Sequence, residues 1–143
     1  MTGNVAQVFV VEEDWRATLA AIRASLRGGG RLVLETRDPA RRAWEEWTRA
    51  ATWTRVQVPG VGEVETWIDL TAVALPLVSF RTSFVFHADG AVLTSDSTLR
   101  FRDRAEVTAS LTAAGFVIDE VREAPDRPGR EMVFVATTGQ PPP

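Results

Sequence analysis

Few side chains in this sequence are of the types that catalyse reactions or bind metals. There is no cysteine, which excludes disulfides, thiolate nucleophiles and cysteine-ligated metals. The one histidine, His87, cannot form a multi-histidine zinc site within one chain, and we predict no metal site. His87 ends a strand-like stretch, where Asp89 or Asp96 could orient it as a general base, although an exposed turn histidine is the commoner case. No residue is assigned a catalytic role.

The stretch RASLRGGGRLVLETRD, residues 23–38, contains a glycine run and a candidate ligand-binding arginine. A phosphate-binding loop needs the order strand, glycines, helix, so that amides at a helix N-terminus face the phosphate. Here a helix precedes the glycines and a strand follows them, which predicts a helix stop and a turn. Arg37 follows the strand, at the edge where open α/β sheets collect ligands. It could bind a carboxylate or phosphate bidentately, or pair with Glu35 or Asp38.

Two further groups of residues could line a binding site. Asn4 and Gln7 stand among small and apolar residues in MTGNVAQVF, which has no helix-start signal. Asn4 could contact a ligand from a strand-to-helix loop, or the N-terminus could simply be solvated. Trp44 and the neighbouring tryptophans are expected in the core, although some could line the bottom of a pocket that binds an apolar substrate.

The elements that must position these residues follow from hydrophobic periodicity. Apolar residues spaced by three or four predict a helix from about Glu12 to the glycines, and a buried strand follows at 32–35. Pro39 is expected to open a second helix, ARRAWEEWTRA. Alternating patterns predict an antiparallel β-meander of strands at 54–58, 63–75, 78–87 and 91–102. Asp103 and Glu106 form a capping-box pattern for the last helix, 104–115, and strands at 116–121 and 132–136 must pair antiparallel because their loop is short.

The bulk properties describe one ordinary α/β domain. The chain has 143 residues and a formal net charge of −3, which suggests no nucleic-acid or anionic-membrane partner. No signal peptide or membrane helix is evident, so we expect a cytoplasmic protein. We expect a single domain over 1–138, made of a helix–strand–helix part (1–53), the meander (54–102) and a helix with the terminal strand pair (103–138). A disordered tail is expected over 139–143.

Three motifs in order resemble the second half of class I S-adenosylmethionine-dependent methyltransferases. LRGGGRLVLE (26–35) is similar to the family's turn into its fifth strand, with Gly28 where proline is usual. LRFRDRAEVTASLTAAGFVIDEVR (99–122) resembles its pre-helix arginine, helix and sixth strand. GREMVFVAT (129–137) resembles the seventh, antiparallel strand that marks the fold. The resemblance implies half of a Rossmann-like methyltransferase sheet with an inserted antiparallel β-meander.

The resemblance also implies roles for several residues. Asn4 and Gln7 would border the cofactor S-adenosylmethionine and the acceptor, and Arg37 would line the same cleft. Trp44 and His87 join Arg37 as predicted contacts of a small-molecule substrate on their residue types alone. The family's glycine-rich cofactor loop, which follows its first strand, has no counterpart in this sequence, so binding of the cofactor by this chain alone is doubtful. The sequence corresponds to a domain that starts about halfway through the family's fold.

A half-domain would leave the strand at 32–35 with an open apolar edge, which predicts self-association, plausibly as a homodimer. Two functions remain open. The chain could transfer a methyl group to a small molecule when completed by a cofactor-binding half. Alternatively, it could be a non-catalytic ligand-binding or dimerisation module derived from a methyltransferase.

Overall fold

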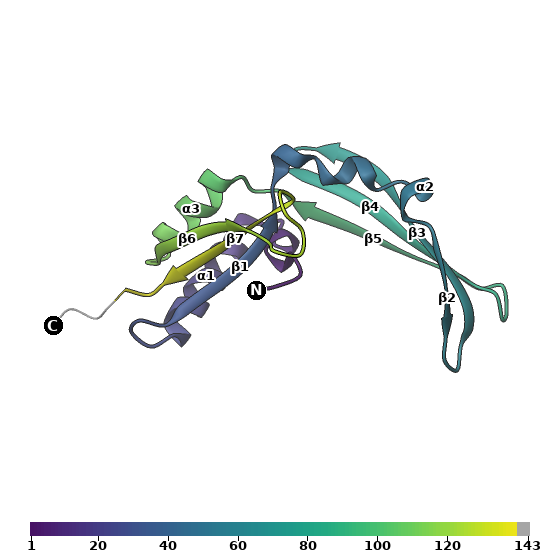
Figure 1. The fold of residues 1–143 in the computed structure, drawn as a ribbon, viewed down its shortest axis with the longest axis horizontal. Coiled ribbons are helices and arrows are strands. Elements are labelled where there is room, and N and C mark those ends of the chain that lie inside the picture. Colours follow the sequence, from purple (N-terminus) through teal and green to yellow (C-terminus); the bar gives the residue numbers. More distant parts are fainter. Residues whose placement is uncertain (140–143) are drawn as a thin grey trace. The chain divides into compact units, whose positions relative to one another are not determined.

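A computed structural model describes residues 1–139, which form two compact units (Figure 1). The first unit combines residues 1–42 with those from 100 onward, and the second spans 43–99. Most of the expected disordered tail, residues 140–143, lies outside the described part of the chain; Gly139 accepts a hydrogen bond from the Gly29 amide through its carbonyl oxygen.

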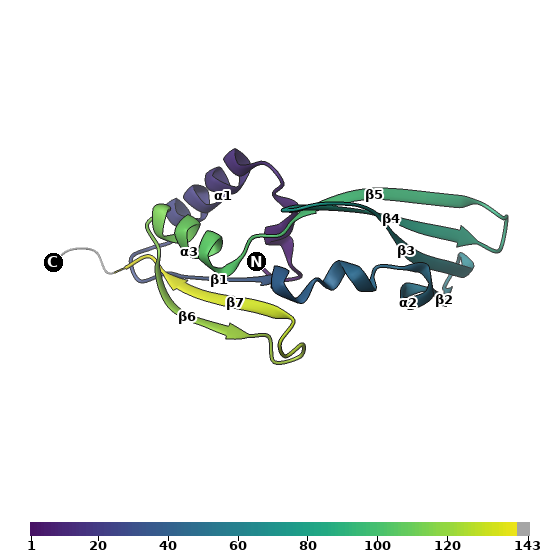
Figure 2. The ribbon, with the colours of Figure 1, turned by 90° about the horizontal axis from the view of Figure 1, so that it is seen from above.

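The first unit is a three-stranded sheet with two helices on one face (Figure 2). Its strand order is β1-β7-β6, and β7 is antiparallel to both neighbours, so β1 and β6 run parallel to each other. The antiparallel pairing predicted for the last two strands is confirmed. The elements of this unit are η1 (Val5–Val8), α1 (Glu12–Ser25), β1 (Arg31–Arg37), η2 (Pro39–Arg41), α3 (Arg104–Ala113), β6 (Val117–Glu123) and β7 (Glu131–Thr137).

The core of this unit lies between the helices and the sheet. Trp15 and Leu19 of α1 are fully buried, as the period of 3.6 residues predicts, and they pack with Leu34 of β1 and Phe134 of β7. Acidic residues in the first turn of α1 complement the positive end of the helix dipole. Burying each of these large side chains stabilises the fold by roughly 1.5–3 kcal/mol.

The glycine run is a turn between α1 and β1, as predicted. Gly29 has a φ of 71°, in the left-handed region that suits glycine. A Cβ added at Gly30 would lie 2.9 Å from the backbone oxygen of Arg27, so a larger residue cannot fit without backbone movement. This order of elements leaves no helix N-terminus at the glycines to receive a phosphate.

The outer edge of β1 is partly covered by the first residue of the chain. The Met1 amino group donates to the Val33 carbonyl at 2.6 Å, and the Glu35 amide donates to the Met1 carbonyl at 3.1 Å. These two bonds flank Leu34 in the pattern of a parallel ladder. The fully open edge expected for this strand is therefore wrong at Leu34.

The capping box of α3 is present as the sequence predicts. The Asp103 carboxylate accepts from the Glu106 amide at 2.8 Å, and the Glu106 carboxylate accepts from the Asp103 amide at 2.9 Å. Gly115 follows the helix with a φ of 83°. This cap fixes where the chain enters the helix after the meander.

The second unit is the predicted antiparallel meander, with strand order β2-β3-β4-β5. One face is polar: Arg81 pairs with Asp96 through two bonds of 2.7 and 2.9 Å, and Ser79 bonds Thr98 at 2.7 Å. The opposite face is apolar, and Trp47 packs against Phe80 there with ring centroids 4.9 Å apart. The strands are β2 (Thr54–Val58), β3 (Gly62–Ala74), β4 (Leu77–Phe86) and β5 (Val92–Arg100).

The single helix expected after Pro39 is wrong, because the segment is broken into three short pieces. After η2, Arg42 adopts a left-handed φ of 48°, which ends the turn. The chain continues as η3 (Ala43–Glu46) and α2 (Arg49–Thr52), and Thr48 caps α2 by accepting from the Ala51 amide. The local caps therefore outweigh the helical period of the tryptophans. None of the helices in residues 1–139 is long and apolar enough to span a membrane.

Candidate functional site

Buried polar side chains gather where β1 ends and β7 begins. Arg37 and Glu131 are directly opposite each other in the β1–β7 ladder, so their side chains share one face of the sheet. Since β1 and β6 are parallel, their carboxyl ends lie at this same edge, where ligands collect in open α/β sheets. We call Asn4, Gln7, Arg37 and Glu131 the polar cluster.

The N-terminal loop brings its two amides to this strand pair. Gln7 is fully buried and its Oε1 accepts from Arg37 Nη1 at 2.9 Å. Asn4 is 4% exposed and its Nδ2 donates to Glu131 Oε1 at 2.7 Å. Three of the sequence-predicted site residues, Asn4, Gln7 and Arg37, are therefore brought together.

Backbone conformation explains how the loop reaches the cluster. Gly3 and Asn4 both have positive φ, 65° and 59°, a conformation that glycine and asparagine tolerate better than other residues. The Gly3 amide donates to the Glu35 carboxylate, which ties the turn to β1. The η1 turn follows at once and holds Gln7 over Arg37. A solvated N-terminus, the alternative reading of this segment, does not occur at Asn4 and Gln7.

The chemistry of the partners fixes the orientation of both amides. An arginine can only donate hydrogen bonds, so the oxygen of Gln7 must face Arg37. A carboxylate can only accept them, so the nitrogen of Asn4 must face Glu131. Flipping either amide would place like groups against each other.

This arrangement leaves three buried polar atoms without a partner among residues 1–139: Asn4 Oδ1, Gln7 Nε2 and Glu131 Oε2. Two of them accept hydrogen bonds and one donates. Each buried polar atom left unpaired lowers the stability of the fold by roughly 1–3 kcal/mol, so such atoms usually bind a water or a ligand. The cluster can therefore bind a polar group that both donates and accepts.

The charges in and around the cluster balance. Arg127 lies on the loop before β7, and its Nη1 donates to Glu131 Oε1 at 2.9 Å, while its Nη2 lies 3.8 Å from Glu35 Oε1. Burial lowers the pKa of Arg37, and the Glu131 carboxylate opposes that shift most strongly. Arginine nevertheless remains protonated, because its intrinsic pKa is far above neutral pH.

A groove of about 490 Å³ borders Glu131 at this edge of the sheet. Its walls include the start of α3 and the ends of β6 and η2. The lining residues that matter here are Asp38, Asp103, Arg104, Glu123, Glu131 and Met132. The groove places one member of the polar cluster beside open space.

The other two predicted substrate residues, Trp44 and His87, belong to the second unit and are not among the contacts of the cluster. Trp44 is 3% exposed, in agreement with the core role expected for the tryptophans. His87 Nε2 lies 3.0 Å from Glu65 Oε1, and its Nδ1 lies 3.9 Å from Glu63 Oε1. His87 is therefore oriented by carboxylates on β3.

Asp89 and Asp96, the carboxylates suggested for orienting His87, serve other groups. Asp89 accepts from the Ala91 amide in the hairpin turn, and Asp96 is paired with Arg81. Glu65 receives hydrogen bonds from Arg55, Trp53 and His87, and the Arg55 contact contributes most to lowering its pKa to about 2. The glutamates of β3 replace the predicted aspartates because the register sets Glu63 opposite His87.

Sequence reasoning missed Glu131 and Arg127. Arg127 lies in the short loop between the last two predicted strands, and Glu131 directly precedes the last of them, at 132–136, without an obvious partner. The one signal that could have found Glu131 is its place at the start of β7, opposite the residue that follows the apolar part of β1. Within residues 1–139, no group of three or more His, Asp or Glu side chains is arranged to hold a metal ion.

No family model and no curated protein matches this sequence. Solved structures do match. A S-adenosylmethionine-dependent methyltransferase from Clostridium acetobutylicum ATCC 824 aligns with a TM-score of 0.70 and 12% identity, over 96% of this chain and 56% of that one. A sugar N-methyltransferase from Streptoalloteichus sp ATCC 53650 aligns at 0.68 and 19% identity, over 98% and 54%.

A third structure is an amino pentose methyltransferase from Micromonospora echinaspora, solved with S-adenosylmethionine bound and involved in calicheamicin biosynthesis. It aligns with a TM-score of 0.65 and 23% identity, over 94% of this chain and 55% of that one. The chain has part of a class I methyltransferase fold. The fold predicted from the sequence motifs is thus confirmed, including the inserted meander within an α/β methyltransferase fold.

The chain spans only about half the length of these methyltransferases. At this level of identity the likeness concerns the fold alone. The ligands and acceptors of the neighbours therefore cannot be assigned to this chain by similarity. The functional proposal rests on the chemistry of the polar cluster.

Proposed function

We propose that this chain forms part of a S-adenosylmethionine-dependent methyltransferase that acts on a small molecule, and that it contacts both the amino-acid end of the cofactor and the acceptor. The polar cluster carries the proposal, because its unpaired atoms lie where ligands collect in such sheets. The methyltransferase fold supports it. Catalysis would use this chain together with the remainder of such a fold, whether on the same polypeptide or another.

The donors and acceptors of the cluster fit the amino-acid end of the cofactor. That end carries an ammonium group and a carboxylate side by side. Asn4 Oδ1 and Glu131 Oε2 are acceptors without partners and suit the ammonium, while Gln7 Nε2 is a donor without a partner and suits the carboxylate. Arg37 adds a positive charge next to Gln7. When bound, S-adenosylmethionine supplies an activated methyl group on its sulfonium sulfur.

This chain's own residues would bind and orient in that reaction. Asn4 and Gln7 hold the cofactor end, and Arg37 keeps the Gln7 amide in the orientation that presents its nitrogen. On the second unit, His87, held by Glu65 and Glu63, is the candidate for contact with the acceptor. We expect the acceptor to present a nitrogen or oxygen atom; among the structural neighbours, one is a sugar N-methyltransferase and another an amino pentose methyltransferase.

A second candidate function is a non-catalytic ligand-binding or dimerisation module. The edge strands of the meander, β2 and β5, favour it, because each pairs with only one neighbour and could pair with a second copy. They also carry exposed apolar residues: Val92 and Leu93 on β5 and Val56 on β2 are between 46% and 59% exposed. We propose that these residues contribute to a homodimer. Light scattering on the eluted protein checks this: a dimer supports self-association, and a clean monomer at all concentrations refutes it.

Calorimetric titration with S-adenosylmethionine tests the proposed function. Although the family's glycine-rich cofactor loop has no counterpart in this sequence, we expect the polar cluster to give the full chain weak affinity for the cofactor. Gln7→Leu should bind it about tenfold more weakly because one donor is lost. Arg31→Gln is the matched control, since Arg31 is exposed at the opposite end of β1. Equal affinity for the wild type and Gln7→Leu, or no binding at all, contradicts contact between the cluster and the cofactor.

A further inference from the structure

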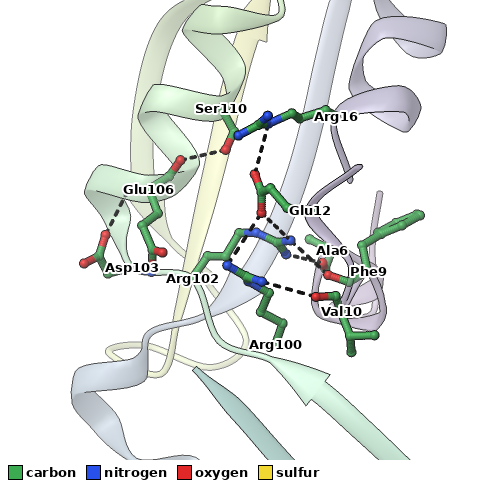
Figure 3. Close-up of polar contacts among 10 residues, drawn as sticks. All are labelled: Ala6, Phe9, Val10, Glu12, Arg16, Arg100, Arg102, Asp103, Glu106 and Ser110. Atoms are coloured by element: carbon green, nitrogen blue, oxygen red, sulfur yellow. Dashed lines mark hydrogen bonds and ion pairs between the residues drawn. The ribbon is translucent and has the colours of Figure 1, made fainter. Parts of the chain in front are cut away.

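A groove between α1 and α3 is distinct from the polar cluster in its residues and its charge. It has a volume of about 730 Å³ and lies on the helical side of the first unit. Alanines from both helices line it. Three arginines, Arg16, Arg100 and Arg102, also line it and are drawn in Figure 3. The residues that matter are Arg16, Ala20, Arg100, Arg102, Ala109 and Ala113.

The three arginines share one carboxylate. Glu12 lies 3.6 Å from Arg16, 3.7 Å from Arg100 and 3.2 Å from Arg102 (Figure 3). The other acidic residue of the groove, Glu106, is bonded to the Asp103 amide in the capping box. Three guanidinium groups against these two carboxylates leave a positive charge in the groove.

The buried atoms without partners near this groove are all donors. Arg100 Nε, Arg102 Nε and Trp15 Nε1 have no hydrogen-bond partner anywhere in the described residues. Arg102 is 3% exposed, and its guanidinium carbon lies 4.8 Å from the centroid of the Trp15 ring. Since a guanidinium and an indole N–H can only donate, the group that completes this set must accept hydrogen bonds.

The remaining nitrogens of Arg102 hold the N-terminal loop. Its Nη2 donates to the Phe9 carbonyl at 2.9 Å, and its Nη1 donates to the Ala6 carbonyl at 3.4 Å. Arg100 Nη1 donates to the Val10 carbonyl at 3.2 Å. These bonds occupy terminal nitrogens of the two arginines and leave the buried Nε of each without a partner.

We propose that this groove binds a small organic anion: a carboxylate held by the arginines, with an apolar body lying over the alanines. The surplus positive charge, the unpaired Nε donors and the alanine-lined wall each match one part of such a ligand. Charge-assisted bonds from arginine to carboxylate are among the stronger polar contacts in proteins. The proposal stands independently of methyl transfer, because none of these residues belongs to the polar cluster.

Titration of the full chain with 2-naphthoate, followed by NMR of arginine Nε–H and backbone amide signals, tests the proposal. We expect the Nε–H signals of Arg100 and Arg102 to shift and saturate. The uncharged, isosteric 2-naphthamide should bind at least about tenfold more weakly, since it lacks the charge that the arginines recognise. Naphthoate affinity should also fall as salt concentration rises.

Two substitutions complete the test. Arg16→Gln should weaken naphthoate binding about threefold or more by removing a charge, and it poses little risk to folding because the Arg16 side chain is 72% exposed. Arg31→Gln, on the sheet, should leave the affinity unchanged. Equal binding of naphthoate and naphthamide, an Arg16→Gln affinity equal to that of the wild type, or no shift at about 5 mM naphthoate overturns the proposal.

Discussion

Replacing Glu131 with leucine should destabilise the first unit by about 2–4 kcal/mol. The carboxylate accepts from Asn4 at 2.7 Å, and Asn4 is only 4% exposed. Leaving that amide unpaired costs roughly 1–3 kcal/mol. Arg37 also loses the charge that most strongly offsets its burial. Arg127 is 41% exposed and can turn to solvent, so its loss adds little.

Two matched variants separate the effect of losing the carboxylate charge on stability from the effect of changing the side chain. Glu131→Gln keeps an acceptor oxygen for Asn4 and should cost about 1 kcal/mol. Glu123→Gln, which changes an exposed glutamate on the neighbouring strand β6, should change stability by less than about 0.5 kcal/mol.

The assay is urea unfolding followed by the indole NMR signal of Trp15, the one tryptophan of the first unit. This signal reports on that unit even if the meander unfolds separately. A Glu131→Leu protein as stable as Glu123→Gln would refute the reasoning, because the cluster would then hold no energetically important bonds.

Three further predictions concern other parts of the chain. The pKa of Glu65 is lowered from its ordinary value of 4.5 to about 2, so its ionised form stabilises the fold above pH 4.5 and this stabilisation is lost as the pH falls toward 2. Carboxyl NMR of Glu65 should show a titration midpoint near 2. A midpoint near 4.5 would refute the ion pairing with Arg55. Asp103→Ala should lower the free energy of unfolding in urea by about 1 kcal/mol, and Asp103→Ser should lower it much less. Equal decreases for the two variants would show that the cap is unimportant. Gly30→Ala should lower the thermal midpoint by several degrees, because its Cβ would meet the Arg27 backbone oxygen at 2.9 Å; an unchanged midpoint would show that the turn relaxes freely.

Local signals in the sequence predicted the elements well. The helix α1 follows from the spacing of Trp15 and Leu19, and the cap of α3 follows from Asp103 and Glu106, because these contacts lie within a few residues of one another. The failure after Pro39 was also local. Thr48 caps α2 and so begins a new helix where the sequence predicts that one helix continues.

The candidate site was predictable only in part. Asn4, Gln7 and Arg37 stand out by residue type and by place near a strand end, but Glu131 lies 127 residues from its partner Asn4. That pairing depends on the register between β1 and β7, which periodicity alone does not determine. The same holds for His87, whose carboxylates come from the neighbouring strand β3 and not from its own hairpin.

The most direct test of the central claim observes the side-chain amide signals of Asn4 and Gln7 while S-adenosylmethionine is added to the full chain. If the polar cluster contacts the cofactor, both signals shift and saturate together, and the Gln7 signal moves because its nitrogen gains an acceptor. Shifts absent from both amides at about 10 mM cofactor would contradict the assignment of this cluster to a methyltransferase site.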